Sequence, residues 1–364
     1  MIEGTYRFVK NFFYSYNIKL PEFFFKNFEK INFIDIGAST FDESNKLLKY
    51  KFVNLHLFEP DNRVLKSFFG KYENLYLYDV GLWSSKSIKE INLLKNQIAS
   101  SIYKPNIKIL KNYLGSIDQY NVEKKEKVEL NKLDSLSKRI KKSDFIKIDA
   151  EGADYDILLG AKKSLNYTIG LQVETQSIER YKDSKLNFEI FKFLDQNNFE
   201  LFIFNKENWP RNLNFNIDTN LQNVWSDVVF FKKISYLIKE LKKKKIKKRK
   251  FYIKKLIFLM IYYKLHDAAI NYIYNIKEEN LISNEDYFYF NSVIKKNISS
   301  NFIILIKDFI KLILLILLLP FSILSFNKYK NFLLNLFIKN LNNIKRLLQI
   351  KLRTKKEVFR NRGI

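Results

Sequence analysis

The chain has 364 residues, of which 47% are hydrophobic and 16% aromatic, and this composition excludes a largely disordered protein. It contains no cysteine and only two histidines, which excludes disulfide scaffolds, thiolate metal sites, cysteine nucleophiles and histidine-rich metal centres. Carboxylates must therefore carry any acid–base chemistry, although the chain as a whole has a formal net charge of +26.

The positive charge is concentrated toward the C-terminus. Residues 236–364 contain 28 Lys and Arg against 8 Asp and Glu, and the basic run at 242–250 marks where the composition changes. We therefore expect three segments: an N-terminal lead-in helix at 1–30, a folded domain at 31–235, and a basic, apolar, mainly α-helical region at 236–364.

Short apolar runs alternate with helical spacing through the second segment. We expect strands at 31–36, 53–58, 75–80, 88–94, 127–130, 144–149, 169–174, 199–205 and 224–231. Helices are expected at 41–50, 62–69, 155–165 and 186–196, with irregular chain at 96–124 and a loop at 205–223. This alternation predicts an α/β fold with a doubly wound, mostly parallel sheet.

Acidic residues follow several of these strands, at the sheet edge where such folds bind ligands. Glu59 ends the second strand, where a carboxylate can accept hydrogen bonds from both ribose hydroxyls of a nucleoside. Asp35 precedes the small-residue turn of Gly37, Ala38 and Ser39, which lacks the G-x-G-x-x-G fingerprint of dinucleotide binding. A carboxylate there suits an ammonium group, and a ligand with a ribose and an ammonium but no phosphate is S-adenosylmethionine.

The strand at 144–149 carries charge. Lys147 and Asp149 share one face because strand side chains alternate, and Glu151 joins them if the extended chain continues. A lysine in a buried strand needs an acidic partner, so we expect it to pair with Asp149 or with an acid of a neighbouring strand. A purely structural ion pair and a functional role both remain open at this point.

Six blocks of residues carry a family resemblance. They are Phe33-Ile34-Asp35-Ile36-Gly37-Ala38, Leu57-Phe58-Glu59-Pro60, Leu133-Asp134-Ser135-Leu136, Asp144-Phe145-Ile146-Lys147-Ile148-Asp149-Ala150-Glu151-Gly152-Ala153-Asp154, Leu158-Leu159-Gly160-Ala161 and Val173-Glu174. In this order they resemble the FkbM-type methyltransferases, across roughly residues 31 to 235. The first turn departs from the family's Gly-Ala-Asn-x-Gly.

The resemblance implies a class I, Rossmann-like fold and S-adenosylmethionine-dependent methylation, usually of oxygen in sugars, glycans or secondary metabolites. A small-molecule or glycan acceptor follows from it. The residues that we expect to bind the cofactor are Asp35, Gly37, Ala38, Ser39, Glu59, Pro60 and Asp79, the last on the adenine side. Transfer from a sulfonium needs an aligned nucleophile and a group that removes its proton.

Three acids are the candidates for that base, or for orienting the acceptor hydroxyl: Asp149, Glu151 and Glu174. They could instead hold a divalent cation, because oxygen ligands suit Mg²⁺ or Ca²⁺, and we expect the acid–base role rather than a metal site. His56 lies within the second expected strand, and we interpret it as a packed residue.

The composition of the third segment, residues 236–364, suggests contact with a membrane. Residues 312–326 are uncharged but too short to span a bilayer, and basic residues flank them on both sides. The apolar spacing that follows is typical of an amphipathic surface helix. We therefore expect a cytoplasmic protein, peripheral or monotopic at the inner face of the membrane, in contact with anionic lipid through residues 236–364. A buried helical domain or an oligomer interface is the alternative.

A second function stays open. The basic C-terminal region could bind RNA, which would make the protein an RNA-binding or ribose-methylating one. The Asn/Asp-Pro-Pro-Tyr block of many base methyltransferases is absent after the fourth strand of the fold. We therefore regard nucleic acid as the less favoured partner.

Overall fold

The structure is a computed structural model that describes residues 18–25, 29–37, 44–60, 70, 72–113, 117–136, 140, 142–212 and 221–298. The chain divides into two compact units, one of residues 20–291 and one of residues 1–19 with 292–364. The first unit holds both sheets and the helices that cover them. The composition boundary near residue 235 falls where the last strand gives way to a helix.

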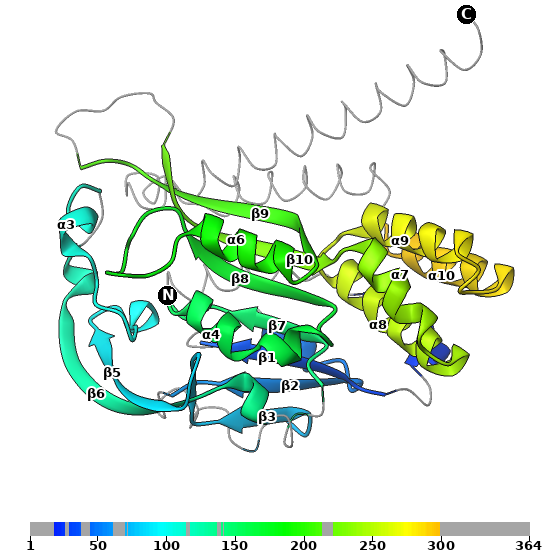
Figure 1. Cartoon of the computed structure of the whole chain (residues 1–364), viewed down its shortest axis with the longest axis horizontal. Helices are drawn as coiled ribbons and strands as arrows, with labels where there is room; N and C mark the ends of the chain where they lie inside the picture. The colour runs from blue at the N-terminus through cyan, green and yellow to red at the C-terminus, as the bar shows by residue number, and fades with distance from the viewer. Residues whose placement is uncertain are drawn as a thin grey trace, which may run out of the picture. The chain divides into compact units, whose positions relative to one another are not determined.

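The centre of this unit is a seven-stranded sheet with the order β3-β2-β1-β7-β8-β10-β9 (Figure 1). Its strands are β1 (Ile31–Ile36), β2 (Val53–Phe58), β3 (Leu75–Tyr78), β7 (Phe145–Ile148), β8 (Gly170–Gln176), β9 (Phe199–Trp209) and β10 (Gln222–Lys232). Neighbours from β3 to β8 pair in parallel, whereas β10 runs antiparallel to both β8 and β9. The predicted α/β fold with a mostly parallel sheet is confirmed.

A second, three-stranded sheet has the order β4-β6-β5 and lies beyond the carboxyl ends of the parallel strands (Figure 1). It consists of β4 (Gly81–Leu82), β5 (Ser87–Leu94) and β6 (Val122–Asn131). The expectation of irregular chain at 96–124 is wrong: this stretch holds η3 (Gln97–Ala99), α3 (Ile107–Leu110), η4 (Ile117–Tyr120) and the start of β6. The start of β6 is exposed and charged, so no apolar alternation reveals it.

Helices on one face of the large sheet close its main core. They are α4 (Asp154–Gly160), α5 (Lys162–Leu165) and α6 (Asn187–Gln196), with η5 (Leu133–Leu136) beside them. Ile157, Leu158 and Leu194 pack there against strand residues such as Ile146 and Val173. The helix expected at 155–165 is present but interrupted at Ala161.

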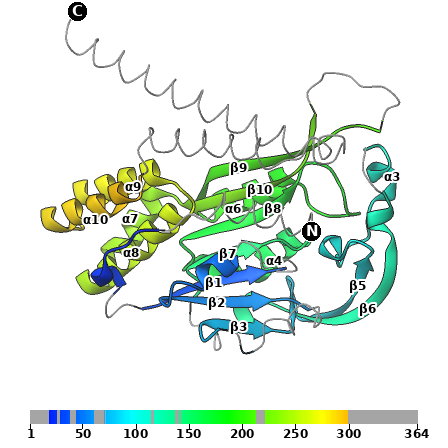
Figure 2. The same ribbon diagram turned by 180° about the vertical axis from the view of Figure 1, so that it is seen from behind.

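A group of helices lies at the opposite end of the sheet from β5 and β6 (Figure 2). It includes α7 (Ile234–Lys242), α8 (Ile246–Tyr262) and α9 (His266–Glu278), and α10 (Asn284–Lys296) follows. On the other face of the seven-stranded sheet, the Phe145 ring stacks on the rings of Phe33 and Tyr263, at ring-centroid distances of 4.9 and 5.0 Å. Lys255 of α8 donates to Asp144 at the start of β7, with N–O distances of 2.8 and 3.0 Å.

Some boundaries differ from those expected. The loop at 205–223 is mostly strand in its described part, because β9 runs on to Trp209 and β10 begins at Gln222. Of the expected lead-in helix at 1–30, the described part contains the short η1 (Glu22–Phe25), whose Phe25 ring stacks on Phe52. Remaining short elements are η2 (Ser44–Leu47) and the turns around it.

The expected helix at 62–69 lies outside the described residues, as do the apolar segment 312–326 and the amphipathic stretch after it. Among the helices that the structure describes, none is both long and apolar enough to cross a membrane.

Candidate active site

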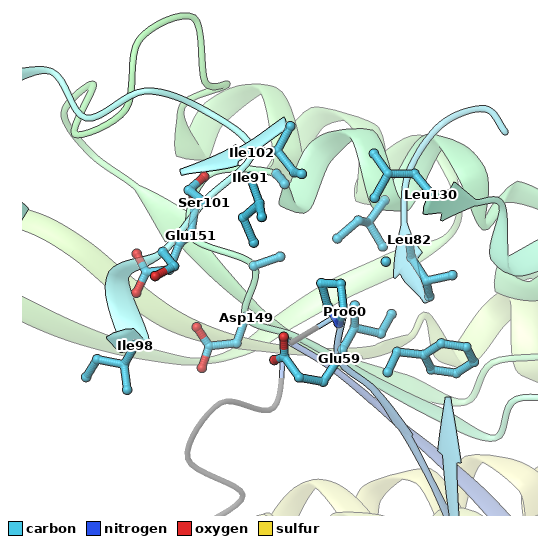
Figure 3. Close-up of a pocket in the computed structure, with 18 of the residues that line it drawn as sticks. Glu59, Pro60, Leu82, Ile91, Ile98, Ser101, Ile102, Leu130, Asp149 and Glu151 are labelled. Carbon is cyan, nitrogen blue, oxygen red and sulfur yellow. The ribbon is translucent and has the colours of Figure 1, made fainter. Parts of the chain in front are cut away.

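A hollow opens at the carboxyl ends of the parallel strands, between the large sheet and the small one. Figure 3 shows the carboxylates of Glu59, Asp149 and Glu151 at this hollow, with Leu82 and Leu130 on its other side. Its lining residues are Ile36, Gly37, Phe58, Glu59, Pro60, Gly81, Leu82, Ile91, Leu93, Gln97, Ile98, Ser100, Ser101, Ile102, Leu130, Asp149, Ala150, Glu151, Ala153 and Ile157. The strand-end rule therefore located the hollow correctly.

Gly37 brings the first strand turn against the turn after β7. Its φ is +78°, and a Cβ at this position would lie 2.0 Å from the carbonyl oxygen of Asp149. The two turns are tied to the sheet by hydrogen bonds of 3.0 Å from Gly37 N to Phe58 O and from Asp149 N to Ile36 O. A side chain cannot fit here, so glycine is required by both conformation and space.

Lys147 pairs with two acids, as the strand pattern predicted. Its Nζ lies 3.5 Å from Asp35 Oδ1 and 3.2 Å from Asp149 Oδ2. Asp35 is 1% exposed, accepts a hydrogen bond from the Ser44 hydroxyl and does not line the hollow. Burial raises the pKa of Asp35, although Lys147 acts in the opposite direction. Asp149, with a side chain 34% exposed, is the member of this group that faces the hollow.

Arg180 organises the other acids. Its Nη2 donates to Glu151 Oε2 at 3.0 Å and also to Glu174 Oε1. The Tyr181 hydroxyl lies 2.8 Å from Glu151 Oε2 and 2.8 Å from the carbonyl oxygen of Ala99. Glu151 lines the hollow, whereas Glu174 is 4% exposed and does not.

Burial dominates the electrostatics of this group. It raises the pKa of Glu151, and that of Glu174 well above its usual value, while Arg180 lowers both. Burial disfavours the charge on Arg180, yet the Glu174 and Glu151 carboxylates raise its pKa well above the ordinary value. The guanidinium is therefore charged, and the two glutamates share its positive charge.

The same three acids meet the geometry of a cation site in one respect. One ligand atom each of Asp149, Glu151 and Glu174 lies within 4.8 Å of the others. Arg180 already donates to two of these carboxylates and supplies the positive charge that a metal ion would bring.

The turn after β7 is held by Asp154. Glu151 and Gly152 have positive φ values of 49° and 94°. The Asp154 carboxylate accepts hydrogen bonds from Ala150 N at 3.2 Å and from Gly152 N at 3.0 Å. Burial raises the pKa of Asp154 to about 7 against these backbone hydrogen bonds. Ser101 adds a hydrogen bond of 2.7 Å from its hydroxyl to the Glu151 carbonyl oxygen, so the turn is fixed from two sides.

Of the remaining residues that we expected to bind the cofactor, some line the hollow and others do not. Glu59 is 6% exposed and lines the hollow beside Pro60, as expected for the end of the second strand. Asp79 lines a separate depression, shared with Pro60, Tyr78 and residues of β6. Ala38 and Ser39 lie outside the described residues.

Sequence reasoning missed two residues of the site. Arg180 and Tyr181 follow β8 in a polar loop, far along the chain from Glu151, and no local spacing links them to it. The available signal was that Arg180 follows Glu174 closely in the sequence, because a buried acid needs a cationic partner. His56 is a packed residue as interpreted: it is 4% exposed, and its Nδ1 lies 3.1 Å from the Tyr78 hydroxyl.

Comparison with known proteins identifies the domain. Residues 35–201 match the family model of the methyltransferase FkbM domain. Among solved structures the chain is similar to precorrin-6y C5,15-methyltransferase from Geobacter metallireducens GS-15, with 10% identity over 57% of this chain and 85% of that one and a TM-score of 0.29. It is also similar to the 16S rRNA methylase ArmA, with 10% identity over 62% and 83% of the two chains and a TM-score of 0.27.

Both TM-scores are below 0.5, so neither structure indicates an activity for this chain. The chain has no significant match among curated proteins. The family model, in contrast, extends from the end of β1 to the start of β9 and includes the Asp35, Glu59, Asp149, Glu151 and Glu174 positions. The predicted resemblance to the FkbM methyltransferases is therefore confirmed over residues 35–201, which match the model of that domain.

Proposed function

We propose that this protein is an S-adenosylmethionine-dependent O-methyltransferase that acts on a hydroxyl of a sugar, glycan or related metabolite. The observation that carries the proposal is the convergence of Glu59, Asp149 and Glu151 at one hollow within the methyltransferase domain. A methyltransferase domain implies an S-adenosylmethionine cofactor, and the test is whether these residues fit it.

The residues present fit that cofactor. Gly37 lines the hollow and lets the Asp149 backbone pack against the first strand turn, because no Cβ fills the space between them. Glu59, at the end of β2, offers a carboxylate for a ribose diol, and the aliphatic side chains of Leu82 and Leu130 offer an apolar wall for a base. Asp149 supplies negative charge toward a cationic group. When bound, S-adenosylmethionine supplies an activated methyl group on a positively charged sulfur.

The chain's own task is then to align the acceptor hydroxyl and to accept its proton. Glu151 is the proposed base, because burial raises its pKa and a carboxylate of raised pKa accepts protons better than an ordinary one. Asp149, more exposed and held by Lys147, is proposed to orient the hydroxyl. A general base raises the rate about 10²- to 10⁴-fold, and alignment of the reacting groups lowers the barrier by up to about 7 to 11 kcal/mol. Since tenfold in rate corresponds to about 1.4 kcal/mol, alignment is the larger effect.

Arg180 and Tyr181 are positioning residues in this proposal. Both contact Glu151 Oε2, and Tyr181 also reaches the backbone of Ala99, next to the lining residues Ser100 and Ser101. The base is thereby held in one orientation by groups that do not themselves line the hollow. Such support is what preorganised sites require, since small misplacements cost much of the alignment.

The acceptor class is tested by transfer of labelled methyl from S-adenosylmethionine to a panel of methyl glycosides and lipid-linked glycans, with the full chain as enzyme. We expect label in a base-stable methyl ether, and loss of that label in Glu151→Gln. Label on nitrogen, or no transfer to any hydroxyl compound by a protein that binds the cofactor, would contradict O-methylation of such acceptors.

We further propose that residues 236–364 bring the enzyme to an anionic membrane surface on the cytoplasmic side. Lys245, Ile246, Lys247 and Lys248 are exposed at the start of α8, and this combination of cationic and apolar side chains supports the proposal. Co-sedimentation tests it, with vesicles that contain phosphatidylserine compared with vesicles of phosphatidylcholine alone. Binding that needs the anionic lipid is expected, and equal recovery in the supernatant with both vesicle types would contradict it.

A further inference from the structure

The proposed base lies on a strained part of the backbone. Glu151 has a φ of 49°, in the left-handed region that residues with a Cβ seldom adopt, and Gly152 follows with a φ of 94°. Such a conformation is unfavourable for a glutamate and persists only where neighbouring groups hold it. The direction of the Glu151 side chain, toward Arg180 and the hollow, therefore depends on what holds this turn.

The carboxylate of Asp154 reaches the backbone on both sides of Glu151. Its Oδ1 accepts a hydrogen bond from Ala150 N at 3.2 Å, and its Oδ2 accepts one from Gly152 N at 3.0 Å. Ala150 and Gly152 are the residues directly before and after Glu151 in the chain. A carboxylate suits this place because it has two acceptor oxygens and no donor.

Asp154 does not belong to the wall of the hollow. It is 1% exposed, begins α4 and is not among the described lining residues. Burial raises the pKa of Asp154 to about 7, and the neighbouring carboxylates of Asp149 and Glu151 add to the rise. Electrostatics thus oppose an acid at this position, and the two backbone hydrogen bonds are what the acid contributes.

From this geometry we infer that Asp154 is a positioning residue for methyl transfer, which fixes the backbone of Glu151 so that the Glu151 carboxylate points to the acceptor hydroxyl in the hollow. The inference rests on the proposed function, in which Glu151 is the base, and adds a residue that acts only through that base. Ser101, which is bridged to Asn92 of β5, holds the same turn from the other side through its hydrogen bond of 2.7 Å to the Glu151 carbonyl oxygen.

A double-mutant cycle between Asp154→Asn and Glu151→Gln tests the inference. It is made in the full chain and measured as single-turnover transfer of labelled methyl to the methyl glycosides of the acceptor panel. Asparagine has the shape of aspartate but one acceptor oxygen, so it keeps one of the two hydrogen bonds. We expect Asp154→Asn alone to lower the rate about 10- to 100-fold, with the affinity for S-adenosylmethionine unchanged. In the Glu151→Gln background it should lower the rate no further, because a positioning residue acts through the group that it positions.

Asp134→Asn is the matched control. The Asp134 carboxylate also accepts two backbone hydrogen bonds, from Lys163 N at 2.9 Å and from Ser164 N at 2.8 Å, but these hold the start of α5. Asp134 is not among the described lining residues, so its substitution should leave the rate of methyl transfer unchanged. If Asp154→Asn does not fold, as circular dichroism would show, Asp154→Ser takes its place in the cycle, because a serine hydroxyl is a shorter acceptor that suits a helix start.

The possible outcomes separate the inference from the proposed function. If the wild type transfers no methyl to any glycoside, or if Glu151→Gln is as fast as the wild type, the proposed function or its base is wrong and the inference fails with it. If Glu151→Gln is slow but Asp154→Asn is as fast as the wild type, the inference alone is wrong. The inference is also wrong if Asp154→Asn lowers the rate equally in both backgrounds or weakens cofactor binding as much as it lowers the rate, because either result indicates general damage to the site.

Discussion

Buried acids form ion pairs with lysine or arginine at both ends of strand β7, but the two ends differ in how the charges are paired. At its amino end, Asp144 meets Lys255 at 2.8 and 3.0 Å and accepts a further hydrogen bond of 2.9 Å from Asn32 N. At its carboxyl end, Asp149 shares Lys147 with Asp35, and Glu151 shares Arg180 with Glu174. Among the described residues, Asp144 has Lys255 as its own ion-pair partner at the first end, whereas at the second end each cation lies between two acids.

The difference teaches how to tell a structural ion pair from a functional cluster. A balanced buried pair satisfies both charges and joins two elements, here α8 and the sheet. Burial raises the pKa of Asp144 at one end and of Glu151 and Glu174 at the other, so what distinguishes the carboxyl end is that Asp149 and Glu151 line a hollow, which a structural pair does not need. Changes at the two ends should therefore have separable effects, on stability at one and on methyl transfer at the other.

The largest effect is expected from Glu151→Gln. Loss of the proposed base should lower the rate of methyl transfer about 10²- to 10⁴-fold, while the affinity for S-adenosylmethionine changes little. Because burial raises the pKa of Glu151, the wild-type rate should fall as the pH drops through that raised value, and the variant should lose this limb. Single-turnover rates across pH measure both. An unchanged pH profile would remove Glu151 from the role of base.

Lys255→Met should act on stability instead. It leaves Asp144 buried without its partner, at a cost of about 3 to 5 kcal/mol in the free energy of unfolding. Urea denaturation measures this, and adding Asp144→Asn should restore part of the loss. Cofactor affinity measured where the variant is still folded should equal that of the wild type; a large loss of affinity would show that the two ends of β7 are not independent.

Gly37→Ala should weaken cofactor binding roughly 100-fold, because the added methyl would meet the Asp149 carbonyl oxygen and displace one of the two turns. Gly70→Ala is the matched control. Gly70 also has a positive φ, of 71°, but no atom of the described residues lies within 4 Å of a Cβ placed there. Equal effects of the two substitutions would mean that backbone strain rather than the close approach is responsible.

A smaller effect is expected at His56, away from both ends of β7. Burial lowers the pKa of His56 to about 4, from 6.5 in an unfolded chain, so the fold keeps the ring neutral. Stability from this group is present above pH 6.5 and is lost as the pH falls toward 4, by about 2 kcal/mol between pH 7 and pH 5. The difference in unfolding free energy between wild type and His56→Gln should shrink across this window. A constant difference would contradict the neutral buried ring.

Local patterns predicted the parallel sheet because buried parallel strands are continuous apolar runs. The bounds Ile31–Ile36 and Val53–Phe58 agree with the expected ranges for that reason. The pairing of Lys147 followed from the cost of burying a charge alone. Strand β6 was mostly missed, since its solvent-exposed start has no apolar alternation to reveal it.

The site was only partly predictable. Acids at strand ends could be located, because parallel strands bring their carboxyl ends to one edge. The acids that face the hollow could not be predicted, since this depends on how the loops pack. Asp35 accepts a hydrogen bond from Ser44, Glu174 accepts one from Arg180, and Asp79 lies in another depression. Arg180 reaches Glu151 from a loop 29 positions away, a contact that no periodicity records.

The most direct test of the account is a titration of S-adenosylmethionine into the full chain and into Glu59→Ala, with Glu90→Ala as the control outside the hollow. The account predicts saturable binding to one site, abolished or strongly weakened in Glu59→Ala and unchanged in Glu90→Ala. Folded protein that shows no binding, or a Glu59→Ala variant that binds as tightly as the wild type, would contradict the placement of the cofactor at this edge of the sheet.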